Sequence, residues 1–588
     1  EDVAVKPAMG SFAYYNDAML AEGGPFPFFD ESFMANTMRS AMKPLSKVLG
    51  LQVTGGSSST VDAFEKMREA GCAARHLILA AAAEKFGVSV DSLETGNKSV
   101  TDPSSGKSAT YGELAAAASN ASLPSDMKLK DEADWKILGK SPNRVDIPSK
   151  VTGGHIFGVD VELPDMVYGT VKISPKFGSK AKSADKEAAL AVPGVLDIVD
   201  IAVSTGSGFG IIAENTWAAF KGAEALEVEW EDATYPADSE SMFIKIAEAL
   251  DKPADFSLRD DGDVDVAFAD APQEEILEAE FKVPWLAHAC MEPMNATAQW
   301  KDGVLDIWAP TQAPTILQMT CSSLVGVESE DVRVHTTMLG GGFGRRGEVD
   351  FALYAVEMAK KTDGKPIKVT WSREEDTRHD TYRPAMLAKY RARVKSGEVP
   401  SALEAHHAGP SIIKSVLDRT FPGFGAGGPD KTLIEGAFDQ PYTLANYRVS
   451  GHVADLPVPV GFWRSVGNSC NAWFHESFMD EIAEKSGLDP LAMRLELMKD
   501  YPAAVGALKK VAEMSNWGRK MPEGKGLGLA HTLSFGTWVA MVIEVTNEDD
   551  EIKIDHVWAA AELGKVLDPN IVKAQIMSAA IYGLSSAM

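Results

Sequence analysis

The sequence has few cysteines and no long apolar run. Its four cysteines are Cys72, Cys290, Cys321 and Cys470, and no two of them form a C-x-x-C pair. This spacing excludes the usual iron–sulfur clusters and a four-cysteine zinc site, so we interpret the cysteines as small buried apolar residues. No apolar run approaches the roughly 20 residues that span a bilayer, so we expect no membrane span.

Basic residues are also in deficit. The 588 residues include 57 Lys and Arg against 84 Asp and Glu, which gives a net charge of −27. Such a surface repels phosphate backbones and anionic lipid headgroups, so we do not expect nucleic acid as a partner. The hydrophobic fraction of 45% and charged fraction of 24% are ordinary for a globular protein, and the length allows several domains.

The order of helical and β patterns predicts a multidomain α+β fold. We expect an N-terminal segment over 1–135, a compact α/β domain over 145–235, a large domain over 265–515 and the start of another over 520–588. A helix over 61–86 follows TGGSSST, whose Ser and Thr are good N-cap residues. Residues 252–265 are predicted to be a polar connection. The chain begins with Glu1 and stops within a predicted helix, so we expect a fragment truncated at both ends.

Residues 339–351, LGGGFGRRGEVDF, form a glycine-rich loop between a predicted strand and a helix predicted to begin near Glu348. Glycines permit positive φ and remove Cβ atoms, so a ligand can approach the backbone. N–H groups at a helix start favour an anion, and Arg345 and Arg346 would reinforce this. The alternative is a turn whose glycines serve only tight packing.

The same loop matches a dinucleotide-binding pattern. Gly342, Gly344 and Gly347 have the spacing G-x-G-x-x-G after a strand and before a helix. The acidic residue expected after the next strand is ambiguous, because that strand runs into Ser372-Arg373-Glu374. A flavin- or nicotinamide-binding oxidoreductase is therefore one alternative.

Other stretches offer single candidate residues. Gln312 lies between two prolines and is rigidly presented, or it satisfies a buried backbone group. Arg464 precedes a predicted helix among aromatic residues, where it could equally form a half-buried salt bridge. We interpret His288 as a hydrogen-bonded core histidine. His475 lacks the second histidine of a zinc helix, so we predict no metal site there.

The order of the stretches is more informative than any one of them. ACMEPMNATA, WAPTQAP, LGGGFGRR, WSREEDTRHDTYRP and FWRSVGNSCNAWFHESFMDE together resemble the large subunit of molybdenum hydroxylases, the xanthine oxidase and aldehyde oxidase superfamily. Within it, the sequence most resembles the branch formed by the β-subunits of isoquinoline 1-oxidoreductase. By this resemblance 1–135 is a cofactor-binding-like segment and 145–235 is a hammerhead domain. The ranges 265–515 and 520–588 then belong to two molybdopterin-binding domains.

The resemblance implies a cofactor, a reaction and partners. The cofactor is a molybdenum held by molybdopterin, commonly in the cytosine dinucleotide form. The reaction is the hydroxylation of a small-molecule substrate, an N-heterocycle or an aldehyde, with oxygen from water. Because the chain lacks cluster cysteines, a separate small subunit with [2Fe–2S] clusters is implied. The branch further suggests cytochrome c as electron acceptor and a periplasmic location, with the cytoplasm as the alternative.

The resemblance also assigns roles to residues. Gln312 would bond a cofactor or metal oxygen, Phe343 would lie beside the metal's ligands, and Arg464 would orient the substrate. The implied cofactor-binding set is Gly55, Gly56, Ser57, Ser58, Gln312, Gly341, Gly342, Phe343, Gly344, Arg345 and Gln575. No residue is predicted to bind the metal directly.

Two departures from the family pattern qualify these roles. Arg345-Arg346-Gly347 replaces a Gly-Lys-Glu that carries a substrate-contacting acid, which argues against purine substrates. The family's catalytic glutamate lies in a Gly-x-Gly-Glu stretch that this sequence does not contain, so we expect it beyond Met588. A non-catalytic molybdopterin-binding paralogue or carrier is therefore a second alternative.

Overall fold

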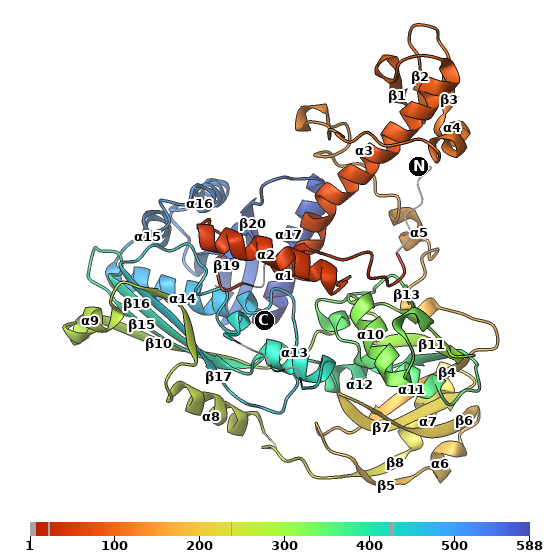
Figure 1. Cartoon of the computed structure of the whole chain (residues 1–588). Helices are drawn as coiled ribbons and strands as arrows, with labels where there is room; N and C mark the ends of the chain where they lie inside the picture. Colours follow the sequence, from red (N-terminus) through yellow and green to blue (C-terminus); the bar gives the residue numbers. More distant parts are fainter. Residues whose placement is uncertain (1–7, 22–23, 237, 424, 426–427) are drawn as a thin grey trace. The chain divides into compact units, whose positions relative to one another are not determined.

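The computed structural model describes residues 8–21, 24–236, 238–423, 425 and 428–588. Residues 1–7, 22–23, 424 and 426–427 fall within predicted domains but lie outside the described residues, as does residue 237. The chain forms two compact units. Unit 1 comprises Glu1–Gly56, Asn143–Lys565 and Ala574–Met588, and unit 2 comprises Ser57–Pro142 and Val566–Lys573. Both mix helices with sheets (Figure 1), so the predicted α+β class is confirmed.

A mixed seven-stranded sheet is the first centre of unit 1. Its order is β13-β12-β11-β14-β4-β7-β6. The strands are β4 (Val167–Ile173), β6 (Val195–Val203), β7 (Gly206–Ala213), β11 (Asn295–Lys301), β12 (Val304–Ala309), β13 (Val332–Thr336) and β14 (Ile367–Thr370). The strands of the predicted hammerhead domain therefore continue the sheet of the large predicted domain, through the parallel pair β14–β4.

The helices that pack on this sheet include α10 (Pro314–Val325) and α11 (Asp350–Ala359). Nine of the ten residues of α11 are buried, as expected for a helix that is apolar on all sides. Phe351 and Tyr354 of α11, and Trp371 just after β14, are among the largest fully buried side chains of the described residues. Phe343, in the glycine-rich loop between β13 and α11, packs against this core.

A five-stranded sheet is the second centre, with the order β10-β15-β16-β17-β9. The strands are β9 (Phe256–Asp261), β10 (Ile276–Val283), β15 (Met386–Arg393), β16 (Ala402–Gly409) and β17 (Asn446–Val453). The helix α14 (Asn468–Ser486) contacts β10 and β15. The predicted polar connection over 252–265 is wrong in part, because β9 alternates Phe256 and Leu258 with polar residues and pairs with β17.

A third sheet consists of β18 (Lys525–Ser534), β19 (Thr537–Glu548) and β20 (Glu551–Glu562), which pair in sequence order. Its contacts include α16 (Pro502–Ser515). The remaining elements of unit 1 are α1 (Ala18–Ala21), α2 (Phe33–Val48), α5 (Ile147–Val151), β5 (Ala181–Asp185), α6 (Glu187–Leu190), α7 (Thr216–Ala225), β8 (Glu227–Trp230), α8 (Ser239–Leu250), α9 (Val264–Ala269), α12 (Arg373–Arg378), α13 (Ile412–Thr420) and α15 (Pro490–Leu497).

Unit 2 has a small core of its own. Its elements are α3 (Ser58–Phe86), β1 (Glu94–Gly96), β2 (Ser99–Thr101), β3 (Ser108–Thr110) and α4 (Tyr111–Ala118). The start of α3 differs from the prediction, because Ser57 at its N-cap has φ +57° and makes no side-chain capping bond. A reciprocal capping box of Thr110 and Glu113 begins α4. The last helix, α17 (Pro569–Ala587), begins in unit 2 and ends in unit 1.

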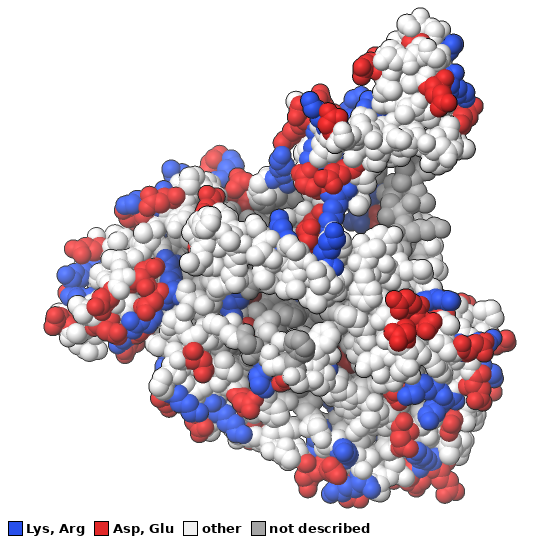
Figure 2. Space-filling model, in the orientation of Figure 1, with Lys and Arg blue, Asp and Glu red and all other residues white. Residues whose placement is uncertain are grey.

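The surface agrees with the acidic composition. Figure 2 shows Asp and Glu interspersed with Lys and Arg on the face drawn, and no continuous basic patch among the described residues on that face. None of the helices in the described part of the chain combines the length and hydropathy needed to cross a membrane.

Candidate functional site

The glycine-rich loop has an unusual backbone. Gly341 and Gly344 have φ of +105° and +108°, and Phe343 between them has φ +56°. A short 3-10 helix over Arg345–Gly347 follows, and α11 begins only at Asp350. The predicted helix start near Glu348 is therefore two residues early, and the loop does not run directly into the N-terminus of that helix.

Other parts of the chain explain most of the glycines. A Cβ atom at Gly344 would overlap the carbonyl oxygen of Phe462, and one at Gly340 would overlap the Glu292 side chain. A Cβ at Gly342 would lie 2.8 Å from Gln312 Oε1. The close neighbours that exclude side chains here are thus protein segments, as the packing alternative supposed.

The loop nevertheless keeps free hydrogen-bond donors. Gly340 N–H donates to Glu292 Oε2 at 2.8 Å, and Gly344 N–H donates to Gln312 Oε1 at 3.1 Å. The N–H groups of Gly341, Gly342 and Phe343 between them have no acceptor among the described residues. Successive free N–H groups in a loop with positive φ form a concavity that binds anions and polar oxygens.

Arg345 is completely buried. Its two terminal nitrogens donate to both carboxylate oxygens of Asp350 at 2.7 and 2.8 Å, and its Nε lies 3.1 Å from Asp380 Oδ1. These carboxylates raise its pKa despite the cost of burial. The predicted role of Arg345 in contacting a cofactor is not supported by its side chain, because internal acids hold the guanidinium.

Arg346 points inward as well. It donates to Glu292 Oε2 at 3.0 Å and to the carbonyl oxygens of Glu292 and Gly341 at 2.9 and 2.8 Å. Burial lowers its pKa, and Glu292 opposes that change. The expectation that the two arginines present positive charge to an anion is therefore wrong for their side chains. Both guanidinium groups point into the protein and bond to buried acids, and Arg346 also bonds to the loop's Gly341 carbonyl oxygen.

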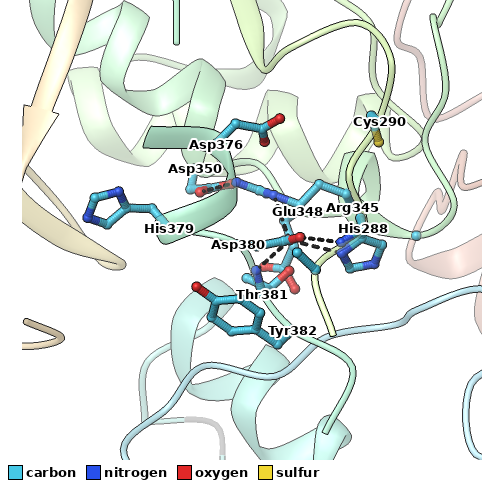
Figure 3. A network of polar contacts seen from close by, with 12 residues as sticks. His288, Cys290, Arg345, Glu348, Asp350, Asp376, His379, Asp380, Thr381 and Tyr382 are labelled. Carbon is cyan, nitrogen blue, oxygen red and sulfur yellow. Dashed lines mark hydrogen bonds and ion pairs between the residues drawn. The ribbon is translucent and has the colours of Figure 1, made fainter. Parts of the chain in front are cut away.

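Asp380 links this network to His288 (Figure 3). Asp380 Oδ1 lies 2.9 Å from His288 Nδ1, and Oδ2 accepts the His288 backbone N–H at 2.5 Å. Burial opposes ionisation of Asp380, but His288 and Arg345 lower its pKa overall. Nearby Asp376 has its pKa raised to about 6, mainly by burial. The interpretation of His288 as a hydrogen-bonded core residue agrees with this geometry.

Gln312 bonds to backbone groups on both sides. Its Oε1 accepts from Gly344 N–H, and its Nε2 donates to the Thr54 carbonyl oxygen at 2.9 Å. The Gln312 backbone N–H donates to the Arg346 carbonyl oxygen, and its own carbonyl oxygen accepts from Thr54 N–H at 2.7 Å. The backbone-satisfying alternative therefore describes most of what Gln312 does, and one amide N–H is left for a ligand.

Arg464 lies in a turn that approaches the same loop. Its Nη1 donates to Ser578 Oγ at 3.1 Å, and its guanidinium lies 5.1 Å from the centre of the Tyr582 ring. The same ring lies 5.0 Å from the Phe343 ring and 4.7 Å from that of Trp463. The structure thus brings Phe343 and Arg464 together around Tyr582, a residue that the sequence did not single out.

The other predicted cofactor-binding residues lie in the turn before α3, at the start of α3 and on α17. Gly55 and Gly56 end the first segment of unit 1, and Ser57 and Ser58 begin unit 2. Ser57 is exposed and Ser58 is buried. Gln575 is exposed on α17. Thr54, the residue before this turn, bonds to Gln312 through both its backbone N–H and its carbonyl oxygen.

The cysteines and His475 lie mainly in the protein interior. Cys290, Cys321 and Cys470 are buried as predicted, whereas Cys72 is half-exposed. His475 is buried and lies 2.6 Å from the Tyr447 hydroxyl. No group of three or more potential metal ligands occurs among the described His, Cys, Asp and Glu residues.

Sequence reasoning missed Asp380, Glu292 and Tyr582. Asp380 and Glu292 lie in two of the stretches on which the resemblance rests, WSREEDTRHDTYRP and ACMEPMNATA. The available signal was that acidic residues in these stretches could pair with the two arginines of the glycine-rich loop. The partners, however, lie 35 and 54 positions apart in the sequence, so no local pattern could pair them.

The dinucleotide alternative does not fit this architecture. In such a fold, the strand before the glycines and the strand after the helix are parallel neighbours or nearly so. Here β12 and β11 both lie between β13 and β14. The G-x-G-x-x-G spacing at Gly342, Gly344 and Gly347 is therefore coincidental.

Comparison with known proteins decides the family resemblance. Residues 250–498 match the family described as molybdopterin cofactor-binding domain, and this range contains the glycine-rich loop, Gln312 and Arg464. This part of the chain is similar to molybdopterin cofactor-binding domains. The predicted resemblance to molybdenum hydroxylase large subunits is thereby confirmed.

Curated relatives cover most of the chain. It is 29% identical over 594 residues to the beta subunit of isoquinoline 1-oxidoreductase of Brevundimonas diminuta, a match that covers 92% of this chain and 74% of the relative. It is also 29% identical over 578 residues to a membrane-bound aldehyde dehydrogenase (pyrroloquinoline-quinone) of Gluconacetobacter polyoxogenes, with the same two coverages.

Solved structures show the same fold. Quinoline 2-oxidoreductase from Pseudomonas putida 86 matches with a TM-score of 0.51 and 18% identity, over 70% of this chain and 58% of that one. CO dehydrogenase from Oligotropha carboxidovorans matches with a TM-score of 0.53 and 16% identity, over 67% and 58%. The chain thus spans less than two thirds of the length of these solved chains.

Proposed function

We propose that this chain is the molybdopterin-binding subunit of an oxidoreductase that hydroxylates an N-heterocycle or an aldehyde with oxygen from water. One observation carries the proposal. The match to the molybdopterin cofactor-binding domain over 250–498 contains the loop whose three free N–H groups lie between Gln312 and the Phe343–Tyr582–Arg464 cluster. The catalysed reactions named for the relatives, on isoquinoline and on aldehydes, supply the two substrate classes.

The residues of the loop fit a polar, anionic cofactor. The N–H groups of Gly341, Gly342 and Phe343 would hold its oxygen or sulfur atoms, and the remaining amide N–H of Gln312 would donate beside them. A Cβ at Gly341 would lie 3.1 Å from the Phe343 ring, so glycine keeps this face open. When bound, the molybdenum cofactor supplies two-electron oxidation of the substrate and an oxygen atom taken from water.

The chain's own residues would then bind and orient the substrate. Phe343 and Tyr582 offer aromatic faces, and the Arg464 guanidinium is a fixed cation beside them. A cation in this position favours substrates that develop negative charge during the reaction. Gly55, Gly56, Ser57, Ser58 and Gln575 are proposed as further cofactor contacts, on the resemblance alone.

Partners are part of the proposal. Two relatives are each named as one subunit of a larger enzyme, an isoquinoline 1-oxidoreductase and a nicotinate dehydrogenase, and this supports a multi-subunit enzyme. The absence of paired cysteines in this sequence supports a separate small [2Fe–2S] subunit as electron acceptor. On the resemblance to the isoquinoline branch we further propose the cytosine dinucleotide form of the cofactor, transfer of electrons to cytochrome c and a periplasmic location.

The test begins with metal and pterin content. The protein is isolated with its partner subunits from cells that make the cofactor, and molybdenum per chain is measured by mass spectrometry. We expect stoichiometric molybdenum in the parent protein and loss of most of it in Gly341→Ala, because φ +105° disfavours any side chain. Gly303→Ala is the control, since Gly303 also has positive φ but meets nothing within 4 Å.

Turnover then separates the alternatives. With isoquinoline or an aromatic aldehyde in ¹⁸O-labelled water, we expect labelled product from the molybdenum-containing protein. Molybdopterin binding without turnover would favour the non-catalytic paralogue or carrier. Turnover in protein free of molybdenum would contradict the proposal outright.

A further inference from the structure

The turn that carries Arg464 has a strained backbone. Ser465 and Val466 have φ of +68° and +50° in succession. Left-handed conformations are rare for residues other than glycine and rarest for β-branched ones such as Val466. The turn is closed internally by Val466 N–H, which donates to the Trp463 carbonyl oxygen at 2.6 Å. Asn468 N–H and Ser469 N–H also donate to the Ser465 and Val466 carbonyl oxygens, at 3.1 and 3.2 Å. These bonds lie within the turn and the helix start that follows it, so we look to the surrounding structure for what keeps two residues strained.

The first restraint acts before Arg464. His288 Nε2 lies 3.2 Å from the Phe462 carbonyl oxygen, and His288 Nδ1 lies 2.9 Å from Asp380 Oδ1. A carbonyl oxygen and a carboxylate both accept hydrogen bonds and cannot donate them. His288 therefore has an acceptor on each side of its ring, and its Nε2–H is the donor to the Phe462 carbonyl oxygen.

The His288 ring is itself immobilised. Its side chain is 1% exposed. Asp380, which holds it, also accepts the Thr381 backbone N–H at 2.7 Å and lies 3.1 Å from Arg345 Nε. The Phe462 carbonyl is thus bonded to a rigid donor.

The second restraint acts after Arg464. Glu435 Oε1 accepts the Gly467 backbone N–H at 3.0 Å, and Glu435 is 5% exposed. A Cβ at Gly467 would overlap the Thr432 carbonyl oxygen. The segment that follows the turn is therefore held against residues 432–435 both by a buried hydrogen bond and by close backbone packing.

We propose that His288 and Glu435 are positioning residues that together hold the Arg464 turn in its strained conformation. Their two hydrogen bonds, at Phe462 and Gly467, enclose the strained residues and fix the direction in which the Arg464 guanidinium leaves the backbone, toward Ser578 and Tyr582. The effect on turnover rests on the proposed function, whereas the restraint itself is a property of the chain.

Hydrogen exchange of the whole protein tests the restraint directly. In His288→Gln and in Glu435→Met we expect amides of 463–468 to exchange about tenfold faster, as loss of one buried hydrogen bond implies. Glu435→Gln keeps a carbonyl acceptor and should restore slow exchange. Peptides from β16 are the internal control. Unchanged exchange over 463–468 in both His288→Gln and Glu435→Met would overturn the proposal.

A substitution that removes the strain provides the complementary test. Val466→Gly should raise the midpoint of urea unfolding, because glycine adopts φ +50° without strain. It should also speed exchange of the turn, because the released turn samples other conformations. Asp302→Gly is the matched control, since Asp302 has φ +52° in an exposed turn between β11 and β12. A raised midpoint with exchange of 463–468 unchanged would mean that the restraints do not hold a strained turn.

The catalytic consequence is measured by non-additivity. Turnover per molybdenum is compared for His288→Gln, Arg464→Ala and the double variant. If His288 acts through Arg464, adding His288→Gln to Arg464→Ala lowers turnover by less than about twofold, although it lowers the parent's turnover by about tenfold or more. Equal factors in both backgrounds would overturn the positioning role. If no variant or parent turns over substrate, the proposed function fails, and the exchange result still decides the restraint.

Discussion

Single residues in the glycine-rich loop are set by what approaches them. Gly344 is required because the Phe462 carbonyl oxygen occupies the space of a Cβ atom, and Gly340 because Glu292 does. Gly347 has no neighbour within 4 Å of a Cβ position. Glycines of the same loop therefore have different roles. The roles of Gly340 and Gly344 depend on segments more than 40 positions away in the sequence.

Gly344→Ala should be severely destabilising. The new methyl group would meet backbone that cannot rotate away, at φ +108° that already disfavours alanine. Overpacking and strain together should lower the free energy of unfolding by more than about 3 kcal/mol. Urea unfolding followed by circular dichroism measures the change. Gly347→Ala should stay within about 0.5 kcal/mol of the parent, and similar losses in both variants would refute this account of Gly344.

Arg345 illustrates a limit of sequence reasoning at the residue scale. Two arginines after a glycine loop suggested a positive site for a ligand, but their charge balances Asp350, Asp380 and Glu292. The charge of a side chain does not show whether it points into the protein or toward solvent. Both guanidinium groups point inward because buried acids, two of them from distant segments, pair with them.

Arg345→Met should leave Asp350 and Asp380 buried without their common partner. Breaking a buried ion pair from one side costs about 3–5 kcal/mol, because the remaining charges are not compensated. The measurement is again the free energy of unfolding in urea. Arg333→Met is the control, since the Arg333 side chain is 55% exposed and pairs loosely with Asp306 at 3.6 Å. A loss below about 1 kcal/mol for Arg345→Met would contradict the buried pairing.

At the scale of elements, the sequence predicted which helices and strands form better than it predicted which residues pack against them. The strands β12, β13 and β14 and the helices α11 and α14 follow from periodicity and flanking turns. Which polar residues these elements bury together does not, because that depends on tertiary neighbours. The helix α14 buries His475 and Glu476 against Tyr442, Tyr447 and Arg494, and β16 buries His407 against α14.

His407 should make the protein sensitive to acid. Its Nδ1 lies 2.9 Å from Asn471 Oδ1 and its Nε2 lies 3.1 Å from the Tyr390 hydroxyl. Burial lowers its pKa from 6.5 to about 3. Below pH 6.5 the unfolded chain binds a proton that the folded chain refuses until about pH 3, so stability falls as pH falls through this window.

Urea unfolding at several pH values measures this contribution. In the parent, His407 should contribute a slope of up to about 1.4 kcal/mol per pH unit between about pH 6 and about pH 4. His407→Gln should remove this contribution, so that its free energy of unfolding falls less steeply with acid. His556→Gln is the control, because the side chain of His556 is 66% exposed. Parallel pH curves for the parent and His407→Gln would exclude a neutral buried His407.

At the scale of the whole molecule, the two compact units do not coincide with the segments predicted from local sequence pattern. The predicted segment 1–135 is split, because residues before Ser57 bond to strands and helices of unit 1. Gly10 N–H donates to the Val334 carbonyl oxygen at 2.9 Å, and Gln52 N–H donates to Thr315 Oγ1 at 2.9 Å. Short irregular segments carry no periodicity that identifies their distant partners, so the four predicted boundaries remain predictions.

The two units should differ in how far a core defect spreads. Leu114 is fully buried in the small core of unit 2, with Leu79 and Val100. Leu114→Ala should cost about 2–5 kcal/mol. A core as small as that of unit 2 has little stability in reserve. We therefore expect unit 2 to open while unit 1 stays folded.

Hydrogen exchange with mass spectrometry distinguishes local from global unfolding. In Leu114→Ala, peptides from 72–118 should exchange much faster, whereas peptides from β11 and β12 should keep their parent rates. Leu305→Ala is the matched variant in unit 1, because Leu305 is equally buried in β12, and it should produce the opposite pattern. If Leu114→Ala accelerates exchange in both regions to the same degree, the chain unfolds as one cooperative body. The separation into two units would then describe contacts and not stability.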